Sequence, residues 1–246
     1  MASGCFDLLA ANYDRDWTNS SSGILQREAV WRHIGELFRA GDTVLDLGCG
    51  TGEDAVGLAD KGVRVHALDA SPEMVKIARS RGIWAQIGNI ENLQNFEGEF
   101  QGVISNFGAL NCIADLAPIR RPLARLVLPS GFLAVCLMNR FCLIESLHYL
   151  RRLQFRKAAR RWSGHACAAR LALDVFYPLP RRVMNALRPE FRLIQRVGIG
   201  LSVPPSFVRG VSSASMRVRK RIDEHVSGWT LLRSLADHQL FIFVRE

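Results

Sequence analysis

Three glycines at alternate positions follow an apolar segment, and this stretch of the chain is the best suited to chemistry. Residues 43–47 read Thr-Val-Leu-Asp-Leu, and Gly48, Gly50 and Gly52 come directly after them. Glycine has no Cβ, so backbone with this spacing can turn tightly and approach a ligand closely. Asp46 places a carboxylate two residues before the first glycine, and no Gly-Lys-Ser/Thr follows to hold phosphates. The loop therefore suits a cationic ligand without phosphate groups.

The elements around this loop must place it at one edge of a sheet. Residues 43–47 read as a buried strand, and residues 54–61 read as the helix that follows the glycines. Strands and helices continue to alternate to about residue 138, which is the pattern of a parallel sheet with right-handed crossovers. In doubly wound sheets the ligand lies in the crevice at the carboxyl ends of the strands. The glycine loop is therefore predicted to line such a crevice.

Further polar loops follow the other predicted strands. The strand over residues 63–69 ends in a carboxylate, Asp69. Residues 88–93 form the loop after the next strand, and residues 100–106 lead into a loop over residues 107–111. Because the carboxyl ends of parallel strands meet at one edge, these loops are predicted to surround one site.

In this order and spacing, the four motifs resemble those of class I S-adenosylmethionine-dependent methyltransferases of the small-molecule type. The resemblance covers residues 10–138 well and the last 50 residues more loosely. It implies a single domain with a Rossmann-like α/β fold, whose seven-stranded sheet is mostly parallel. The last strand, predicted at residues 239–244, is antiparallel in this fold. A helical insertion over residues 139–188 is expected to cap the acceptor pocket, and the implied cofactor is S-adenosyl-L-methionine.

The resemblance also assigns roles to individual residues. Asp46 lies near the cofactor's ammonium group in the family, Asp69 accepts hydrogen bonds from the ribose, and residues 88–93 hold the adenine. Arg27 lies on a helix predicted over residues 24–38, and its guanidinium matches a carboxylate bidentately, so it is a candidate for the cofactor carboxylate. The predicted cofactor-binding residues are Arg27, Asp46, Gly48, Cys49, Gly50, Gly52, Asp69, Ala70, Met74, Asn89, Ile90, Glu91, Asn106, Phe107 and Asn111.

One position of the adenine loop departs from the family pattern. The family usually has Asp where this chain has Asn89. An amide can still meet an exocyclic amine through its oxygen, so we expect Asn89 to keep the adenine contact.

A general base is less clearly marked. Tyr13 and His148 are the candidate catalytic residues, and Asp14 and His238 are further candidates from their expected position near the mouth of the site. Methyl transfer from a sulfonium is an in-line displacement from a reactive donor, so the protein mainly supplies alignment and a dry site. A phenol, thiol or carboxylate acceptor then needs no protein base.

The basic residues are concentrated in one part of the chain. The formal net charge is +9, yet residues 1–138 carry 12 Lys/Arg and 16 Asp/Glu, whereas residues 139–196 carry 13 and 3. Residues 141–162 have helical periodicity, with an apolar face opposite a basic face. The pattern allows three interpretations: a solvated face of a cap helix, attraction of an acidic substrate, or contact with a membrane surface or lipophilic substrate.

Composition excludes other classes of protein and site. The six cysteines have neither CxxC nor His/Cys metal spacing, which predicts no metal site and free thiols in a reducing compartment, the cytoplasm. No signal peptide is expected at the N-terminus, and the longest apolar run is far shorter than a membrane span. The loop at residues 106–109 lacks the Asn-Pro-Pro-aromatic sequence of base-flipping amino methyltransferases, so no nucleic-acid partner is expected.

The predicted function is therefore methyl transfer from S-adenosylmethionine to oxygen, carbon or nitrogen of a small or medium-sized organic acceptor, acidic or lipophilic. Two alternatives remain open at this point. One is an inactive cofactor-binding sensor or accessory protein, since one scaffold hosts many functions. The other is a membrane-associated lipid or quinone methyltransferase that uses the basic cap helix.

Overall fold

A seven-stranded sheet organises the chain. The computed structural model describes residues 3–168, 173–206, 208 and 212–246. The sheet has the order β3-β2-β1-β4-β5-β9-β8. Its strands are β1 (Thr43–Leu47), β2 (Arg64–Asp69), β3 (Trp84–Ile87), β4 (Phe100–Ser105), β5 (Val127–Met138), β8 (Phe191–Ile199) and β9 (His238–Arg245).

Strand direction confirms the predicted fold class. The pairs β1–β2, β1–β4, β2–β3 and β4–β5 are parallel, and β9 is antiparallel to both β5 and β8. Strands β1, β4 and β5 are buried along most of their length. Their apolar sequences suit this central position, because helices cover both faces of a parallel sheet.

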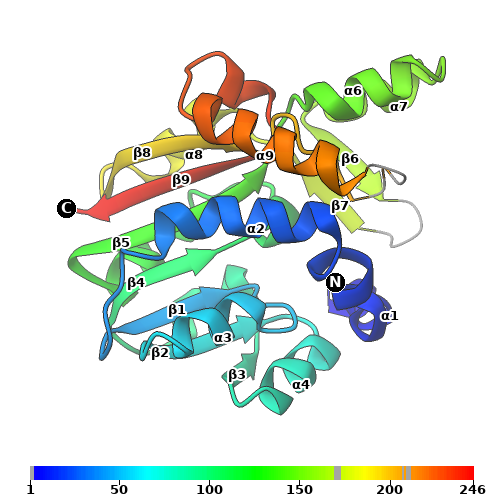
Figure 1. Cartoon of the computed structure of the whole chain (residues 1–246). Helices are drawn as coiled ribbons and strands as arrows, with labels where there is room; N and C mark the ends of the chain where they lie inside the picture. Colours follow the sequence, from blue (N-terminus) through cyan, green and yellow to red (C-terminus); the bar gives the residue numbers. More distant parts are fainter. Residues whose placement is uncertain (1–2, 169–172, 207, 209–211) are drawn as a thin grey trace.

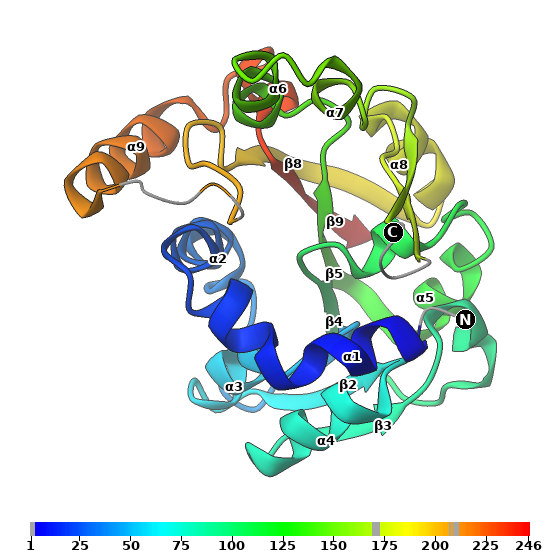
Figure 2. The same ribbon diagram turned by 90° about the vertical axis from the view of Figure 1, so that its right-hand side faces the viewer.

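Helices cover both faces of the sheet, as Figures 1 and 2 show. They form two apolar cores with it, one on each face. One core includes Ile34, Leu58 and Val75 from the helices on one face, and the other includes Leu123 and Leu187 from the helices on the opposite face. The helices around the sheet are α1 (Ser3–Tyr13), α2 (Ser21–Ile34), α3 (Glu53–Ala59), α4 (Pro72–Ser80), α5 (Arg120–Leu126), α8 (Pro180–Leu187) and α9 (Ser213–Val226).

The segment between β5 and α8 is more varied than the helical cap that the sequence predicts. Instead of one helix over residues 141–162, it contains α6 (Leu143–Leu150) and α7 (Phe155–Ala158). The break falls at Leu153, whose φ of 56° is incompatible with a right-handed helix. A β-hairpin of β6 (His165–Ala168) and β7 (Leu173–Phe176) follows. Figure 1 shows α6 and α7 projecting from the body of the protein.

Short helical turns complete the carboxyl edge of the sheet. They include a π-helix, η1 (Asp14–Thr18), and the 3-10 helices η2 (Ile90–Asn95), η3 (Ala109–Cys112) and η4 (Leu232–Leu235). Within the described part of the chain, no helix combines the length and the apolar character that spanning a membrane demands.

Candidate active site

The glycine loop after β1 is shaped by two close approaches. The N–H groups of Gly48 and Cys49 donate to the carbonyl of Leu68 at 2.7 and 3.1 Å, which fastens the loop to β2. Gly48 has a φ of +72°, and a Cβ there would lie 2.1 Å from the Cβ of Ala109. A Cβ on Gly50, by contrast, would meet no atom within 4 Å, because this residue faces an open cavity. Gly48 thus allows the loop to pack closely against Ala109, and Gly50 leaves the backbone open to a ligand in the cavity.

Asp69 ends β2 beside this loop and is held in place by backbone. Its carboxylate accepts hydrogen bonds from the N–H of Gly50 at 2.8 Å and from the N–H of Ser71 at 2.9 Å. Burial raises the pKa of Asp69, although these N–H groups favour the charged form and oppose the rise. The carboxylate retains acceptor capacity that points to the cavity, where paired hydroxyls of a ribose could be bound.

A cavity of about 630 Å³ lies at the carboxyl ends of β1, β2 and β4. This volume is in the range of pockets that hold a cofactor with part of a substrate. Most of the predicted cofactor-binding residues meet on its wall. Those lining it are Gly48, Gly50, Asp69, Ala70, Met74, Asn89, Ile90, Glu91, Asn106 and Phe107. The catalytic candidate Tyr13 lines it as well.

A second pocket of about 30 Å³ adjoins the first and shares Tyr13, Gly48, Gly50, Asn106 and Phe107 with it. Three further predicted residues line this smaller pocket: Arg27, Asp46 and Cys49.

Three buried polar atoms around the smaller pocket have no hydrogen-bond partner among the described residues. They are Asp46 Oδ2, Asn106 Oδ1 and Arg27 Nε. Burial, together with the negative charge of Asp54, raises the pKa of Asp46 well above its usual value. Unpaired buried polar atoms are costly, so such a cluster indicates a ligand. The two acceptor oxygens of Asp46 and Asn106 suit a ligand ammonium group, and the guanidinium N–H of Arg27 suits a ligand carboxylate. An amino acid carries both of these groups.

Asp54 organises this pocket, and the sequence analysis missed it. Its carboxylate forms an ion pair with Arg27 at 2.6 Å and accepts hydrogen bonds from Trp31 Nε1 at 2.8 Å and from Asn106 Nδ2 at 3.1 Å. Arg27 therefore already has a carboxylate partner, and its buried Nε remains without a hydrogen-bond partner among the described residues. The available signal was an acidic residue in the first turn of the helix after the glycine loop, a position that the helix dipole favours.

Trp17 is a second residue that the sequence analysis missed. Its ring lies 4.8 Å from that of Phe107, and the guanidinium of Arg27 lies 5.1 Å from both rings. Phe107 has a φ of 54°, a strained conformation that is concentrated at functional sites. Trp17 lies on the π-helix η1, a feature also frequent at such sites. These groups close one end of the smaller pocket.

Helix α1 covers the larger cavity. Asp7 accepts hydrogen bonds from the hydroxyl of Ser71 and the N–H of Glu73, which fasten α1 to the start of α4. Figure 2 shows α1 crossing in front of β2. Tyr13, at the end of this helix, lines both pockets. Burial raises the pKa of Tyr13 to about 12, so the phenol is protonated at neutral pH and is suited to donate a hydrogen bond, not to act as a base.

Three predicted site residues line neither pocket. Gly52 caps α3, and a Cβ there would approach Ala78 at 3.0 Å, so this glycine serves packing. Asn111 is fully buried and donates to the carbonyl of Phe176 at 2.6 Å, which joins η3 to β7 behind the cavity wall. His148 lies on α6, with its ring 5.2 Å from that of Tyr149, away from both pockets.

The other two base candidates are also engaged elsewhere. Asp14 accepts a hydrogen bond from the hydroxyl of Thr51 at 2.7 Å and forms an ion pair with Arg81. His238 is buried with its ring 5.7 Å from that of Phe107. Burial lowers the pKa of His238, although Asp237 opposes the change, so the imidazole is neutral at physiological pH. Neither side chain lines the larger cavity.

The end of the cavity distant from Asp46 is apolar. Strand β7 contributes Leu173, Val175 and Phe176, and the first two pack in one apolar cluster with Phe6 of α1 and Met138 of β5. The inserted segment between β5 and α8 therefore lines the cavity through β7 of the hairpin, and no residue of α6 or α7 lines it. Asp174 is the acidic residue on this wall, and it pairs with His165 at 2.8 Å. An apolar planar group fits this end.

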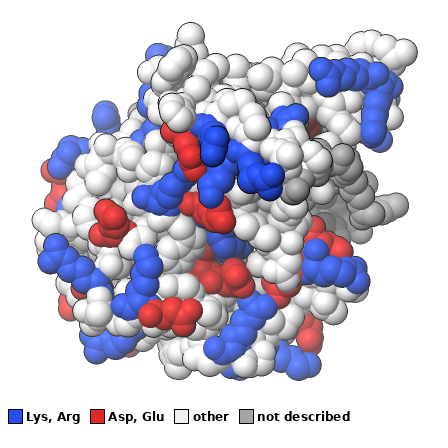
Figure 3. Space-filling model, viewed as in Figure 1, with Lys and Arg blue, Asp and Glu red and all other residues white. Residues whose placement is uncertain are grey.

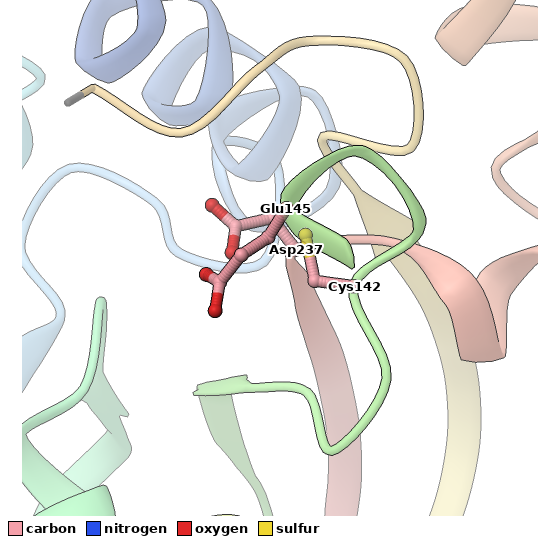
Figure 4. Close-up of side chains that lie close together, drawn as sticks. All are labelled: Cys142, Glu145 and Asp237. Carbon is pink, nitrogen blue, oxygen red and sulfur yellow. The ribbon is translucent and has the colours of Figure 1, made fainter. Parts of the chain in front are cut away.

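A buried group of donor atoms lies beside the site, as Figure 4 shows. Cys142, Glu145 and Asp237 each offer a ligand atom within 4.8 Å of the others. The guanidinium of Arg161, however, lies 2.6 Å from Glu145 and 2.9 Å from Asp237. A cation already occupies the space between the carboxylates, so the group is a buried ion-pair cluster that fastens the base of α6 to β9.

Comparison with known proteins agrees with this geometry. Residues 44–131 match the family described as Methyltransferase domain. The Ubiquinone biosynthesis O-methyltransferase of Xanthomonas oryzae pv. oryzae is 35% identical over 110 residues, which are 42% of this chain and 46% of that protein. The Demethylmenaquinone methyltransferase of Corynebacterium kroppenstedtii is 33% identical over 133 residues, 53% of this chain and 57% of that protein.

A solved structure extends the likeness over the whole sheet. The S-adenosylmethionine-dependent methyltransferase from Mesorhizobium loti superposes with a TM-score of 0.65 at 17% identity, covering 92% of this chain and 100% of that one. This likeness shows the fold, whereas the chain spans about half the length of the curated relatives it matches. The match over residues 44–131 identifies a methyltransferase domain in that part of the chain, and the likeness to the solved structure shows that the chain has the fold of class I S-adenosylmethionine-dependent methyltransferases.

Proposed function

We propose that this protein transfers a methyl group from S-adenosylmethionine to an apolar, quinone-type aromatic acceptor. The observation that carries the proposal is one continuous cavity with two chemically different ends. One end holds Asp69 and the glycine loop, and the other is walled by apolar side chains of β7. A polar nucleoside and an apolar acceptor could lie side by side in this space.

The chain's own residues fit the cofactor. Asp69 would hold the ribose, and the residues of the Asn89 loop with Met74 would frame the adenine. The unpaired atoms of Asp46, Asn106 and Arg27 would hold the ammonium and carboxylate of the methionine part. When bound, S-adenosylmethionine supplies a methyl group on a positively charged sulfur.

The residues around the acceptor end suit transfer by alignment. The apolar wall excludes water and fixes the plane of an aromatic ring, which favours an in-line approach. Tyr13 would donate a hydrogen bond to an acceptor or cofactor oxygen, because its phenol is protonated. Among the described residues, no histidine lines the cavity, so the acceptor itself would supply an ionisable hydroxyl or an electron-rich carbon.

The relatives support a quinone-type acceptor. Two of them are named for methylation in ubiquinone biosynthesis and of demethylmenaquinone. The apolar wall of Leu173, Val175 and Phe176 suits the same chemistry in this chain. We also propose a reducing compartment, the cytoplasm, because the six cysteines are scattered along the sequence without CxxC or metal-ligand spacing.

Turnover of defined acceptors tests this function. The full chain would be incubated with S-adenosylmethionine and a panel of hydroxylated quinols with and without a prenyl tail, and S-adenosylhomocysteine release would be followed with the mass of the product. Methylation of a quinol, with Val175→Asp abolishing it and leaving cofactor affinity unchanged, is the expected result. Cofactor binding without turnover of any quinol would overturn the proposal of a quinone-type acceptor and would favour a non-catalytic binding protein.

Affinity for S-adenosylmethionine is expected to rise with pH through the raised pKa of Asp46. The ammonium of the cofactor pairs with the ionised carboxylate, so below that pKa binding must release a proton from Asp46. Asp46→Asn should bind more weakly at neutral pH and show a shallower pH dependence. Calorimetry over a pH series, in buffers with different ionisation enthalpies, measures both the affinity and the protons released. An unchanged pH slope in Asp46→Asn would assign the dependence to another group.

A further inference from the structure

The tip of the α6–α7 projection combines exposed apolar side chains with cations. Residues 150–157 read Leu-Arg-Arg-Leu-Gln-Phe-Arg-Lys, and every one of them is exposed. The side chain of Leu153 is 76% exposed and that of Phe155 is 62% exposed. Stable folding removes large apolar side chains from water, so two such residues at the end of a projection indicate a surface that is covered in use.

The backbone presents Leu153 outward at a cost. Its φ of 56° lies in the left-handed region, where a leucine is strained and a glycine would not be. Strain of this kind is concentrated at functional positions. Glycine would adopt this turn without strain, yet the residue at this position is Leu153, the most exposed apolar residue of the projection.

The charge of the tip is of one sign. Arg151, Arg152, Arg156 and Lys157 lie within the same eight residues, and in the part of the chain that the structure describes no carboxylate forms an ion pair with any of them. Figure 3 shows Lys and Arg side chains, drawn in blue, on the projection at the upper right, with no red at its outer end. The one acidic residue of α6, Glu145, is buried in the ion-pair cluster at the base.

Helix α9 provides an informative contrast. It is also basic and also exposes apolar residues, Val218 and Ile222. Two of its charged residues, however, are used within the protein: Lys220 pairs with Glu28, and Glu224 pairs with Arg32, which docks α9 on α2. The tip of the projection makes no such docking, so its cations are available to a partner.

The base of the projection is rigid and joins the cavity. Helix α6 follows β5, which ends at Met138, and α7 is followed by the hairpin that contains β7. Met138 and β7 both line the apolar end of the cavity. Arg161 fastens this base to Asp237, the residue directly before β9. A surface that binds the tip would therefore be held at a fixed position relative to the apolar end of the cavity.

From these observations we propose that residues 150–157 insert into the surface of a membrane that carries anionic headgroups. Leu153 and Phe155 enter the boundary between headgroups and acyl chains, while the four cations pair with lipid phosphates at the surface. Their long stems allow the charged ends to stay at headgroup level. The proposal goes beyond methyl transfer and does not depend on it, since it concerns binding alone; it would place the site beside a lipid-phase acceptor.

Sedimentation of the full chain with vesicles tests the proposal without any cofactor. We expect binding to phosphatidylcholine vesicles that contain about one third phosphatidylglycerol, and weak binding to phosphatidylcholine alone or at high salt. Replacing all four cations by Gln should weaken binding to anionic vesicles by roughly tenfold or more.

Leu153→Gly separates binding from folding. Glycine removes the apolar side chain and relieves the strained φ, so the variant should keep or raise the melting temperature and still bind anionic vesicles several-fold more weakly. Combining it with Phe155→Gln should remove most of the remaining binding. The matched control is Leu231→Gln, which changes another exposed leucine, 82% exposed and outside the projection, and should bind as the wild type does.

Three outcomes would overturn the proposal. The wild type could remain in the supernatant with anionic vesicles, which would leave a protein partner as the occupant of the tip. The tip variants could sediment as the wild type does. Binding could also be equal on both lipid compositions and insensitive to salt. Titration of the same samples with S-adenosylmethionine reports on the cofactor site independently, so failure of the methyltransferase proposal would be recognised separately.

Discussion

Asp69→Ala is expected to weaken S-adenosylmethionine binding by at least about thirtyfold, a loss of about 2 kcal/mol. A hydrogen bond to a charged acceptor contributes about 1.5–3 kcal/mol, and Asp69 would accept such bonds from the ribose hydroxyls. The same carboxylate also positions the glycine loop through the N–H of Gly50 at 2.8 Å. Both effects act in the same direction, so this substitution has the largest expected effect on the cofactor site.

Calorimetric titration with S-adenosylmethionine and S-adenosylhomocysteine measures this loss. Asp174→Asn is the matched control, because Asp174 is a carboxylate on the same cavity wall but at its apolar end. Its cofactor affinity should equal that of the wild type. Equal affinities of Asp69→Ala and the wild type would show that the ribose is held elsewhere. Absence of binding of either nucleoside to the wild type would remove the methyltransferase function altogether.

The second large effect is on stability: Arg161→Met should destabilise the protein by about 3–5 kcal/mol. Arg161 is 6% exposed and lies between the carboxylates of Glu145 and Asp237. Burial alone would lower the pKa of Arg161, but the two carboxylates raise it above its ordinary value, so the guanidinium stays charged. Removing it leaves two buried carboxylates without a cation, which accounts for the size of the loss.

The neighbouring arginine provides the control. Arg160 pairs with the same Glu145 at 2.6 Å, but its side chain is 41% exposed. Arg160→Met should therefore cost no more than about 1 kcal/mol, as solvent-exposed ion pairs do. Thermal and urea unfolding of both variants measure the difference, which we expect to appear as a drop in Tm on the order of 10 °C for Arg161→Met alone. Similar losses in the two variants would contradict the assignment of Arg161 as the central cation.

Adding Glu145→Gln and Asp237→Asn to Arg161→Met should recover part of the lost stability. The triple variant retains hydrogen-bonding groups but no buried charge, so the penalty for unpaired carboxylates disappears. The ion-pair cluster also holds the base of the projection, so the single Arg161→Met variant should loosen the placement of α6.

The parallel half of the sheet could be predicted from sequence because its signals are local. Apolar runs at residues 43–47 and 100–106, with glycine and polar loops after them, determine both strand position and the edge at which the loops meet. The antiparallel β9 also lies where it was predicted. Each of these elements depends on the period of its own residues and on the handedness of crossovers.

The insertion was predicted less well because its structure depends on distant contacts. The hydrophobic period of residues 141–162 continues across Leu153, so no local signal, Gly or Pro, marks the break between α6 and α7. Strand β6 contains no β-branched residue and pairs only because β7 lies beside it. Alternation in β7 buries Leu173 and Val175 on one face, but only the packed hairpin could show that this strand lines the cavity opposite the loops after β1 and β2.

For the site, the sequence by itself determined which loops line the cavity, because glycine spacing and strand-end carboxylates are read along the chain. Tertiary structure alone decided which partners each group has. It paired Arg27 with Asp54, brought Trp17 onto Phe107, and buried Tyr13 so that its phenol stays protonated. It also placed Asn111 and His148 off the cavity wall. Pairing and burial depend on residues far apart in sequence, and these interactions, not residue type, set charge state and access.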